Sequence, residues 1–136
     1  MKLYRAMTPD PDRRPTVARH ARALGVRVNG DVRDVFPDPD GCVLPRAGGM
    51  SVAPDDPWHL PAFRRPRRLG RGSTGHDEDL VFSIDEASVE TCGLAIRVDA
   101  PDRSHALIEP AVVEPLGDYE ARLVATRPVW AVDEPR

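Results

Sequence analysis

Prolines and glycines recur along almost the whole sequence, and they limit the length of every regular element. There are 15 prolines and 10 glycines among 136 residues, which is well above average usage. Proline removes a backbone donor and glycine weakens helices, so both favour turns between short elements. The composition therefore predicts many short strands and few short helices, and it excludes a long coiled coil.

Composition also restricts the class of protein. With a formal net charge of −3, the chain lacks the basic face of a general nucleic-acid binder, so general DNA binding is not expected. No apolar run approaches the roughly 18–20 residues of a membrane span, and no signal peptide is visible at the start. The length fits one domain, residues 1–136. The sequence thus predicts a single cytoplasmic domain with no membrane partner.

Several short segments have the apolar content and alternation of β-strands. The first ends at Thr8-Pro9-Asp10-Pro11, which continues neither a strand nor a helix. Two apolar runs joined by residues 45–49 predict a hairpin. The expected strands are residues 1–7, 42–44, 50–53, 80–84, 94–98 and 105–109, with a last strand at 129–132.

Two segments carry apolar residues at helical spacing. Residues 15–24 predict a short helix that ends at Gly25. Asp118 is placed to N-cap a second helix over residues 119–126, which ends before Pro128. Residues 26–40, between this first helix and the expected hairpin, are compatible with an edge strand or with irregular structure.

Two of the strands each contain one polar residue in an apolar run. Arg5 lies in Leu3-Tyr4-Arg5-Ala6, and a buried charge must pair with an anion or line a polar cleft. Ser51 follows two glycines in Gly48-Gly49-Met50-Ser51-Val52, where the backbone can approach a ligand closely and the hydroxyl can bind it. Together they predict a cleft for a molecule with phosphate and ribose. The structural alternatives are an internal ion pair for Arg5 and an ordinary strand position for Ser51.

Other chemistries lack their motifs. The four histidines and two cysteines never occur at metal-ligand spacing, so no metal is expected. Cys42 and Cys92 are expected to be free thiols, with a single disulfide as the alternative. No Gly-x-Ser-x-Gly nucleophile elbow is present. Residues 70–75 resemble a phosphate loop but lack its lysine and precede a strand, so they predict a flexible glycine-rich loop.

A long loop is expected over about residues 54–75, because this segment is rich in proline, arginine and glycine. Its arginines follow two aromatic residues, a combination that suits phosphate contact and base stacking. The alternative is a solvated loop that the acidic run Asp77-Glu78-Asp79 balances and holds. The arginines are Arg64, Arg65, Arg67, Arg68 and Arg71, and the aromatic residues are Trp58 and Phe63.

Three segments together resemble the Tse2-type ADP-ribosyltransferase toxins of bacteria. They are Tyr4-Arg5-Ala6, Gly48-Gly49-Met50-Ser51-Val52 and Tyr119-Glu120-Ala121-Arg122-Leu123-Val124-Ala125-Thr126, which occur in the order of that family over roughly 20 positions. The resemblance implies a compact α+β domain, with short strands in two small, mostly antiparallel sheets and few short helices. The two sheets would flank a cleft for NAD, which is the substrate.

The resemblance also implies roles for individual residues. Arg5 matches the first-strand arginine and would hold a pyrophosphate or ribose oxygen, and Ser51 matches the serine that would orient the nicotinamide ribose. Arg127 follows the Ala-Thr pair, where a relative has histidine. The further NAD-binding candidates are Tyr4, Gly49, Met50 and Arg127.

Cleavage of the bond between nicotinamide and ribose develops positive charge on the ribose, so a nearby carboxylate stabilises the transition state. The Glu-x-Glu loop of the better-known transferases is absent, which leaves this carboxylate open. Glu109 is the first candidate for a catalytic role beside Ser51, ahead of Glu114 and Glu120. The alternative for Glu109 is a solvent-exposed strand end.

The resemblance predicts a bacterial toxin-like, NAD-dependent ADP-ribosyltransferase, or an NAD glycohydrolase, in the cytosol of its own or a target cell. Such a toxin implies an immunity or antitoxin protein, an unknown macromolecular target, and export by a secretion system without a signal peptide. Two alternatives come from other classes. One is a small module whose residues 58–71 bind RNA or an acidic protein, and the other is a metal-independent ribonuclease that uses His76 or His105.

Overall fold

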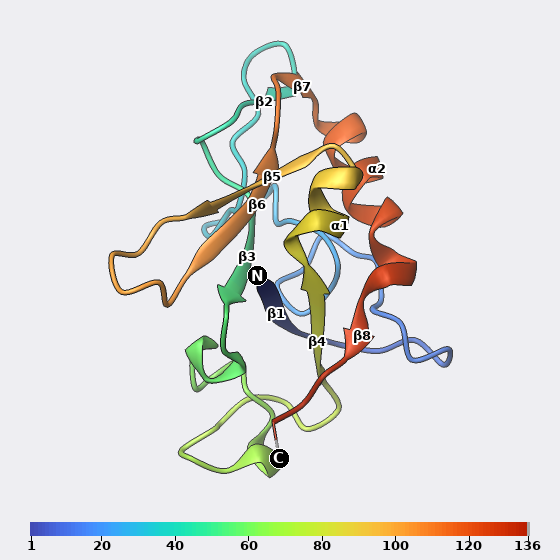
Figure 1. The fold of residues 1–136 in the computed structure, drawn as a ribbon. Helices are drawn as coiled ribbons and strands as arrows, with labels where there is room; N and C mark the ends of the chain where they lie inside the picture. Colours follow the sequence, from blue (N-terminus) through green and yellow to red (C-terminus); the bar gives the residue numbers. More distant parts are fainter. Residues whose placement is uncertain (136) are drawn as a thin grey trace.

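The computed structural model describes residues 1–135 and is an α+β domain built on one main sheet (Figure 1). The strand order is β5-β6-β3-β1-β4-β8, with every neighbouring pair antiparallel, and β2 and β7 form a separate antiparallel pair. The elements are β1 (Lys2–Met7), β2 (Cys42–Val43), β3 (Met50–Pro54), β4 (Leu80–Asp85), α1 (Glu86–Thr91), β5 (Leu94–Val98), β6 (Ala106–Pro110), β7 (Glu114–Pro115), α2 (Leu116–Ala125) and β8 (Ala131–Val132). Short 3-10 turns occur at Pro57–His59, Arg67–Leu69 and Arg127–Val129.

The expected α+β class, with short strands and few short helices, is confirmed. Strands β1, β4, β5 and β6 lie where the sequence placed them, and β8 falls within the expected last strand. The expected two antiparallel sheets are also present, but they are not both small, because six strands join into one sheet and the second sheet has two residues in each strand.

Strand β3 joins two halves of the main sheet. Its residues 50–52 pair with β6, whereas Ala53 and Pro54 pair with β1. Pairing between β1 and β3 stops after Tyr4, while β1 pairs with β4 along its whole length. The backbone ladder is therefore interrupted beside Arg5, where the second half of β1 faces the first half of β3.

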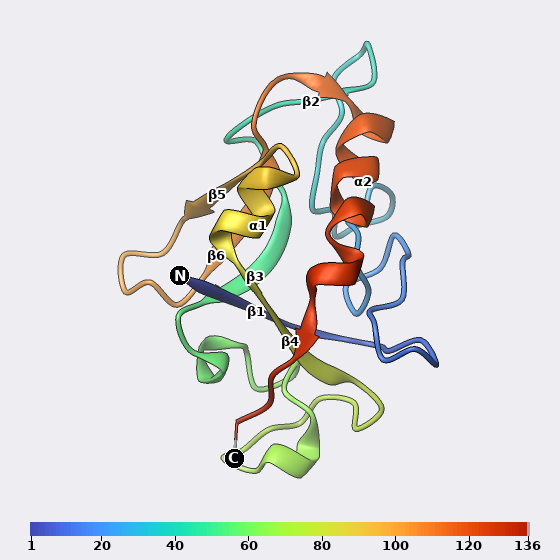
Figure 2. The same ribbon diagram turned by 45° about the vertical axis from the view of Figure 1, so that its right-hand side comes forward.

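The main core lies on the side of the sheet that carries both helices (Figures 1 and 2). Helix α1 contributes Val89 to this core, and α2 contributes Tyr119 and Leu123. The Tyr119 hydroxyl donates to the carbonyl of Ile108 at 2.6 Å and accepts from the backbone N–H of Met50 at 3.3 Å. These two bonds fix α2 to β6 and β3.

A smaller apolar cluster occupies the opposite side of β1. Tyr4 and Ala6 pack there with Ala53 of β3, Val81 of β4 and Leu60 from the long loop between β3 and β4. Alternate residues of β1 therefore contact different clusters. Both faces of the strand are covered, which is why five of its six residues are buried.

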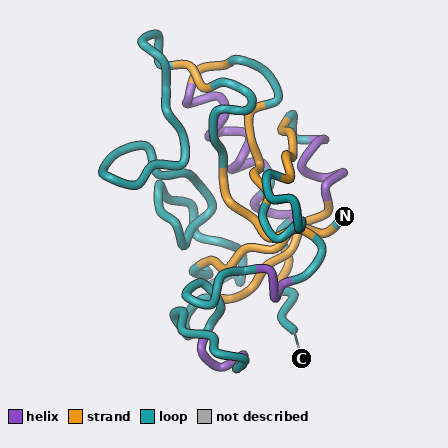
Figure 3. Tube along the Cα trace, turned by 90° about the vertical axis from the view of Figure 1, so that its left-hand side faces the viewer, coloured by secondary structure: helices purple, strands orange, loops and turns teal. Residues whose placement is uncertain are grey.

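The helix expected over residues 15–24 is not formed. This part of the chain consists of turns and isolated bridges, within the long loops that Figure 3 shows. The backbone N–H of Thr16 donates to the Thr8 carbonyl at 2.9 Å, and that of Leu24 donates to the Thr16 carbonyl at 2.8 Å. These partners replace helical i to i−4 hydrogen bonds. Residues 26–40, for which strand and irregular structure were both open, are irregular.

The hairpin expected between residues 42–44 and 50–53 is also wrong. Strand β2 pairs with β7, and β3 pairs with β6 on one edge and with β1 on the other. Because both edges of β3 have partners from distant parts of the chain, the apolar run that precedes it takes another partner. Cys42 and Cys92 are both free cysteines.

The second expected helix is confirmed with an earlier start. Helix α2 begins at Leu116, so Asp118 lies in its first turn, where a carboxylate suits the helix dipole, and the N-cap is Pro115. Helix α1 was not expected from the polar stretch that forms it. Within residues 1–135, no helix is long and apolar enough to cross a membrane.

Candidate functional site

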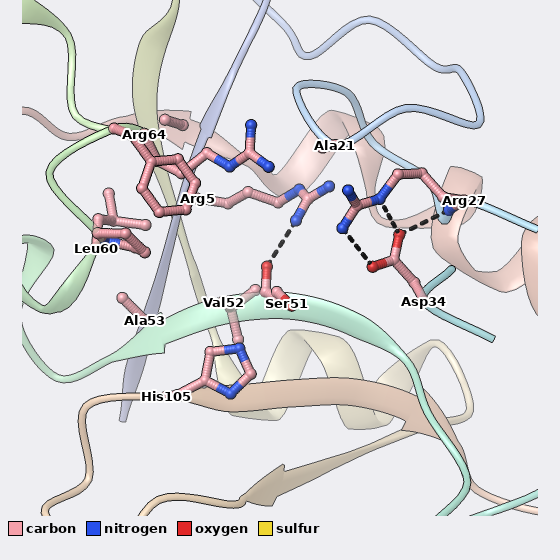
Figure 4. Close-up of a pocket in the computed structure, with 13 residues that line it drawn as sticks. Arg5, Ala21, Arg27, Asp34, Ser51, Val52, Ala53, Leu60, Arg64 and His105 are labelled. Atoms are coloured by element: carbon pink, nitrogen blue, oxygen red, sulfur yellow. Dashed lines mark hydrogen bonds and ion pairs between the residues drawn. The ribbon is translucent and has the colours of Figure 1, made fainter. Parts of the chain in front are cut away.

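A pocket of about 210 Å³ lies where the pairing of β1 and β3 stops (Figure 4). Its walls come from β1, β3, the start of β6, the irregular segment before β2 and the loop after β3. The volume is below the range of about 300–1,000 Å³ that is usual for small-molecule sites, so the pocket can enclose one part of a dinucleotide. Its polar lining residues are Arg5, Arg27, Asp34, Ser51, Arg64 and His105.

Arg5 enters the pocket from β1 and is only 6% exposed. Its Nη1 donates to the Ser51 carbonyl at 2.7 Å, and its Nε and Nη2 donate to the Ala23 carbonyl at 3.1 and 2.9 Å. Burial lowers the pKa of Arg5 to about 10, because a charge away from water is costly. Within residues 1–135 no carboxylate pairs with this guanidinium, so backbone carbonyls, and not an internal ion pair, hold it in place.

Ser51 lies beside Arg5 in the same pocket (Figure 4). The bond from Arg5 to the Ser51 carbonyl takes the place of a backbone ladder bond at the point where β1 and β3 cease to pair. The Ser51 hydroxyl has no hydrogen-bond partner in the described part of the chain. A ligand hydroxyl or phosphate in the pocket can therefore bind it.

Arg64 reaches the pocket from the loop after β3. Burial lowers the pKa of Arg64, and the positive charge of Arg27 lowers it further. Its guanidinium lies 5.0 Å from the centroid of the Phe63 ring. It forms no hydrogen bond or ion pair with residues 1–135. A partly buried guanidinium without an acceptor, close to another guanidinium, is suited to bind an anion.

Arg27 and Asp34 form the one charge-matched pair in the pocket wall. Arg27 donates from Nε and Nη2 to the two Asp34 oxygens at 3.1 and 2.9 Å, and its backbone N–H donates to the same carboxylate at 2.7 Å. The Asp34 carbonyl accepts from the backbone N–H of Gly49 at 3.0 Å. Asp34 is thus held beside β3, and among residues 1–135 it is the only carboxylate that lines the pocket.

The glycines before Ser51 serve close packing of backbone on backbone. A Cβ atom on Gly49 would lie 2.5 Å from the carbonyl oxygen of Ile108 in β6. Gly48 has a φ of +132°, and a Cβ atom there would lie 2.3 Å from the Asp34 carbonyl oxygen. The sequence suggested that these glycines bring the backbone close to a ligand, but the close approach is to β6 and to the segment that carries Asp34.

The structure brings Arg5 and Ser51 together but places the other NAD-binding candidates elsewhere. Tyr4 packs in the smaller apolar cluster, and Met50 is 1% exposed in the main core. Arg127 donates to Asp10 and Asp12 at the surface, at 2.8 and 2.9 Å. Neither these residues nor Gly49 line the pocket.

Glu109 lies on β6 and does not line the pocket either. It is 5% exposed, so the alternative of a solvent-exposed strand end is wrong. Its carboxylate accepts from Arg97 Nε at 3.0 Å and from the Arg46 backbone N–H at 3.1 Å. The lower-ranked Glu114 and Glu120 pair with Arg122 and Arg19 and do not line the pocket.

Sequence reasoning missed Arg27 and Asp34, and it treated Arg64 as one member of a cluster. Asp34 and Arg27 come from irregular backbone, which has no periodicity to mark them. Arg64 and Arg5 are far apart in the sequence. No signal in the sequence separates Arg64 from the other arginines of its cluster, because they differ only in the partners that the fold gives them.

The other arginines of this cluster contact the protein itself. Arg65 donates to the carbonyls of Trp58 and Leu60 at 3.2 and 3.0 Å. Arg67 lies 3.6 Å from Asp77. These contacts agree with the alternative in which acidic residues hold a solvated loop.

A cluster of ion pairs fixes this loop to the rest of the domain. Arg68 pairs with Glu134, and Arg22 pairs with Glu78 and Asp79, both at 2.8 Å. Asp79 is 2% exposed and also accepts from the Thr8 hydroxyl at 2.9 Å. We refer to Arg22, Arg68, Glu78, Asp79 and Glu134 as the latch.

A scan against protein-family models finds no match to the chain, and a search of curated proteins finds no significant match. In residues 1–135, no three histidine, cysteine, aspartate or glutamate side chains gather in a way that could hold a metal ion.

Proposed function

We propose that the protein is a bacterial toxin-like ADP-ribosyltransferase that binds NAD in this pocket and modifies an unknown target in the cytosol. The observation that carries the proposal is the meeting of Arg5 and Ser51. The sequence predicts a ligand-binding role for each, on separate strands, and both line one pocket, where Arg5 donates to the backbone carbonyl of Ser51 at 2.7 Å. The proposal includes membership of the Tse2-type toxins and an ADP-ribosyltransferase-like fold.

The charge of the pocket supports an anionic substrate. Three guanidiniums, those of Arg5, Arg27 and Arg64, line it together with one carboxylate. Arg64 has no acceptor in the described chain, and Figure 4 shows its side chain directed toward the space that Arg5 and Arg27 also face. A pyrophosphate would accept charge-assisted hydrogen bonds there. The pocket is sized for part of a dinucleotide, so the remainder would extend over its rim.

Asp34 replaces Glu109 as the proposed carboxylate near the reacting ribose. It lines the pocket that Ser51 faces, whereas Glu109 is engaged with Arg97 outside it. When the bond from nicotinamide to ribose breaks, the bonding electrons leave with nicotinamide and the ribose becomes positive. A fixed carboxylate stabilises that charge, and the Ser51 hydroxyl would orient the sugar.

The alternative of a module that binds RNA or an acidic protein has less support. It requires several free arginines in residues 58–71, but Arg65, Arg67 and Arg68 are engaged with acceptors of the same chain. Of the two that remain, Arg64 reaches the pocket and Arg71 lies over the Trp58 ring. A toxin of the proposed kind would be controlled by an immunity or antitoxin protein. It would reach a target cell through a secretion system.

The decisive experiment measures nicotinamide release from NAD by the purified protein, together with growth of bacteria that express it. Wild type should release nicotinamide and slow growth. Ser51→Ala should reduce both, because it removes a pocket hydroxyl without changing any protein hydrogen bond. Ser88→Ala in α1, outside the pocket, should behave as wild type. A wild-type protein that neither cleaves NAD nor affects growth would overturn the proposal.

A further inference from the structure

A histidine and a carboxylate form a pair at the rim of the pocket, outside the groups assigned so far. His105 immediately precedes β6 and lines the pocket, and Asp99 immediately follows β5. His105 Nδ1 lies 2.5 Å from Asp99 Oδ1. The backbone N–H of Asp99 also donates to the His105 carbonyl at 3.2 Å. The two residues are therefore joined twice, at the base of the loop that connects β5 to β6.

This pairing determines which ring nitrogen is available. An ionised carboxylate only accepts hydrogen bonds, so Nδ1 carries the proton that it donates to Asp99. In the neutral ring, Nε2 is then unprotonated and can accept a proton. Figure 4 shows the His105 ring directed from β6 toward Ser51. No residue within 1–135 forms a hydrogen bond with Nε2.

We propose that His105 is the general base that deprotonates the acceptor of the ADP-ribosyl group, and that Asp99 is its positioning residue. The proposal rests on the proposed function. In the step, the hydroxyl oxygen of the acceptor forms a bond to C1′ of the ribose as the bond to nicotinamide breaks. The electron pair of that bond leaves with nicotinamide, and the hydroxyl proton moves to His105 Nε2.

The same geometry indicates the chemical class of the acceptor. A guanidinium or ammonium acceptor would have to enter a pocket that already contains the positive charges of Arg5, Arg27 and Arg64. A carboxylate acceptor has no proton to lose at neutral pH. A neutral hydroxyl, from water or from a macromolecule, needs the base that His105 provides. The inferred acceptor is therefore a hydroxyl group.

The test compares steady-state nicotinamide release by wild type, His105→Ala and Asp99→Asn, at several NAD concentrations. His105→Ala should lower kcat about 100-fold and leave KM for NAD unchanged, because the base acts on the acceptor. Added imidazole should restore part of the activity of His105→Ala. Asp99→Asn should lower kcat about 10-fold, with no rescue by imidazole.

His76→Ala is the matched control, since His76 also lies beside a carboxylate, Glu78, at 3.6 Å but outside the pocket. It should keep wild-type kcat. If wild type cleaves NAD and His105→Ala has the same kcat, the assignment of His105 is overturned while the proposed function stands. If His105→Ala is impaired but imidazole has no effect, the base role is overturned in favour of a structural one. If wild type does not cleave NAD, both proposals fall.

Discussion

The pocket and the latch use arginine in opposite ways. In the latch, Arg22 and Arg68 each meet carboxylates, and the buried Asp79 has Arg22 2.8 Å away. In the pocket, Arg27 pairs with Asp34, but Arg5 is held by carbonyls and Arg64 has no acceptor among residues 1–135. Arg68 of the latch and Arg64 of the pocket come from the same arginine-rich stretch of sequence.

The difference shows that the number of arginines in a segment does not indicate whether they form structural ion pairs or bind a ligand. A guanidinium that is matched with a carboxylate fixes one loop to another, and its charge is neutralised within the protein. A guanidinium without a carboxylate leaves positive charge for a ligand. The sequence cannot separate the two cases, because the matching acids come from distant segments.

The largest expected effect is on the latch. Arg22→Ala should lower the free energy of unfolding by about 3 kcal/mol, because it leaves the carboxylate of Asp79 buried without a cation. Urea unfolding monitored by circular dichroism measures this loss. Arg67→Ala is the control, since Arg67 and Asp77 are both substantially exposed and 3.6 Å apart. It should cost about 0.5 kcal/mol or less. Equal losses in the two variants would contradict the role assigned to burial.

The next effect is on ligand binding by the pocket. Arg64→Ala should weaken NAD binding about 10-fold, or about 1.4 kcal/mol, because one charge-assisted contact is lost. Its free energy of unfolding should stay within about 0.5 kcal/mol of wild type, since no protein acceptor is orphaned. Isothermal titration calorimetry and urea unfolding give the two values.

Arg33→Ala is the matched control for this binding experiment. Arg33 lies over the Phe36 ring at 5.1 Å, much as Arg64 lies over Phe63, but it does not line the pocket. Its NAD affinity should equal that of wild type. If Arg33→Ala and Arg64→Ala weaken NAD binding equally, the effect reflects net charge, and the distinction between pocket and latch loses its main support.

The smallest effect is a pH dependence at another matched pair. Arg127 donates to Asp12 at 2.9 Å and holds the pKa of Asp12 below its ordinary value. A lowered folded-state pKa contributes stability above the unfolded value, and the contribution is lost as pH falls through the folded value. The unfolding free energy should therefore decrease below about pH 4. This decrease should be smaller in Arg127→Gln, whereas Arg64→Gln should keep the wild-type acid profile.

Much of the main sheet could be predicted from the sequence because its signals are local. Residues 1–7 show the alternation of a strand, and residues 80–84 are a run of mainly apolar residues. These segments form β1 and β4. The apolar spacing of Tyr119 and Leu123 likewise identified α2. Two failures concern backbone partners. Strand β2 pairs with β7, which is distant in the sequence, and residues 16 and 24 bond to carbonyls eight positions earlier, so no helical or hairpin pattern specifies these partners.

The candidate site likewise contains some residues that the sequence predicts and others that it does not. Arg5 and Ser51 were recognisable because each is a polar residue in an apolar strand, where burying a polar side chain costs free energy unless it has a partner. Asp34 and Arg27 lie in irregular segments, where polar residues are ordinary. Glu109 was selected for its place at a strand end, but the direction of a side chain depends on packing, which here turns it toward Arg97.

Arg5 also limits what genetics alone can establish. Its guanidinium spans the interruption between β1 and β3, so one side chain both completes the sheet and lines the pocket. Under the proposed toxin function, a screen for harmless variants would therefore recover Arg5 substitutions for two unrelated reasons, namely loss of ligand binding or failure of the chain to fold. Survivors at Ser51 and Arg64 do not share this ambiguity, and their clustering in such a screen would map the pocket directly.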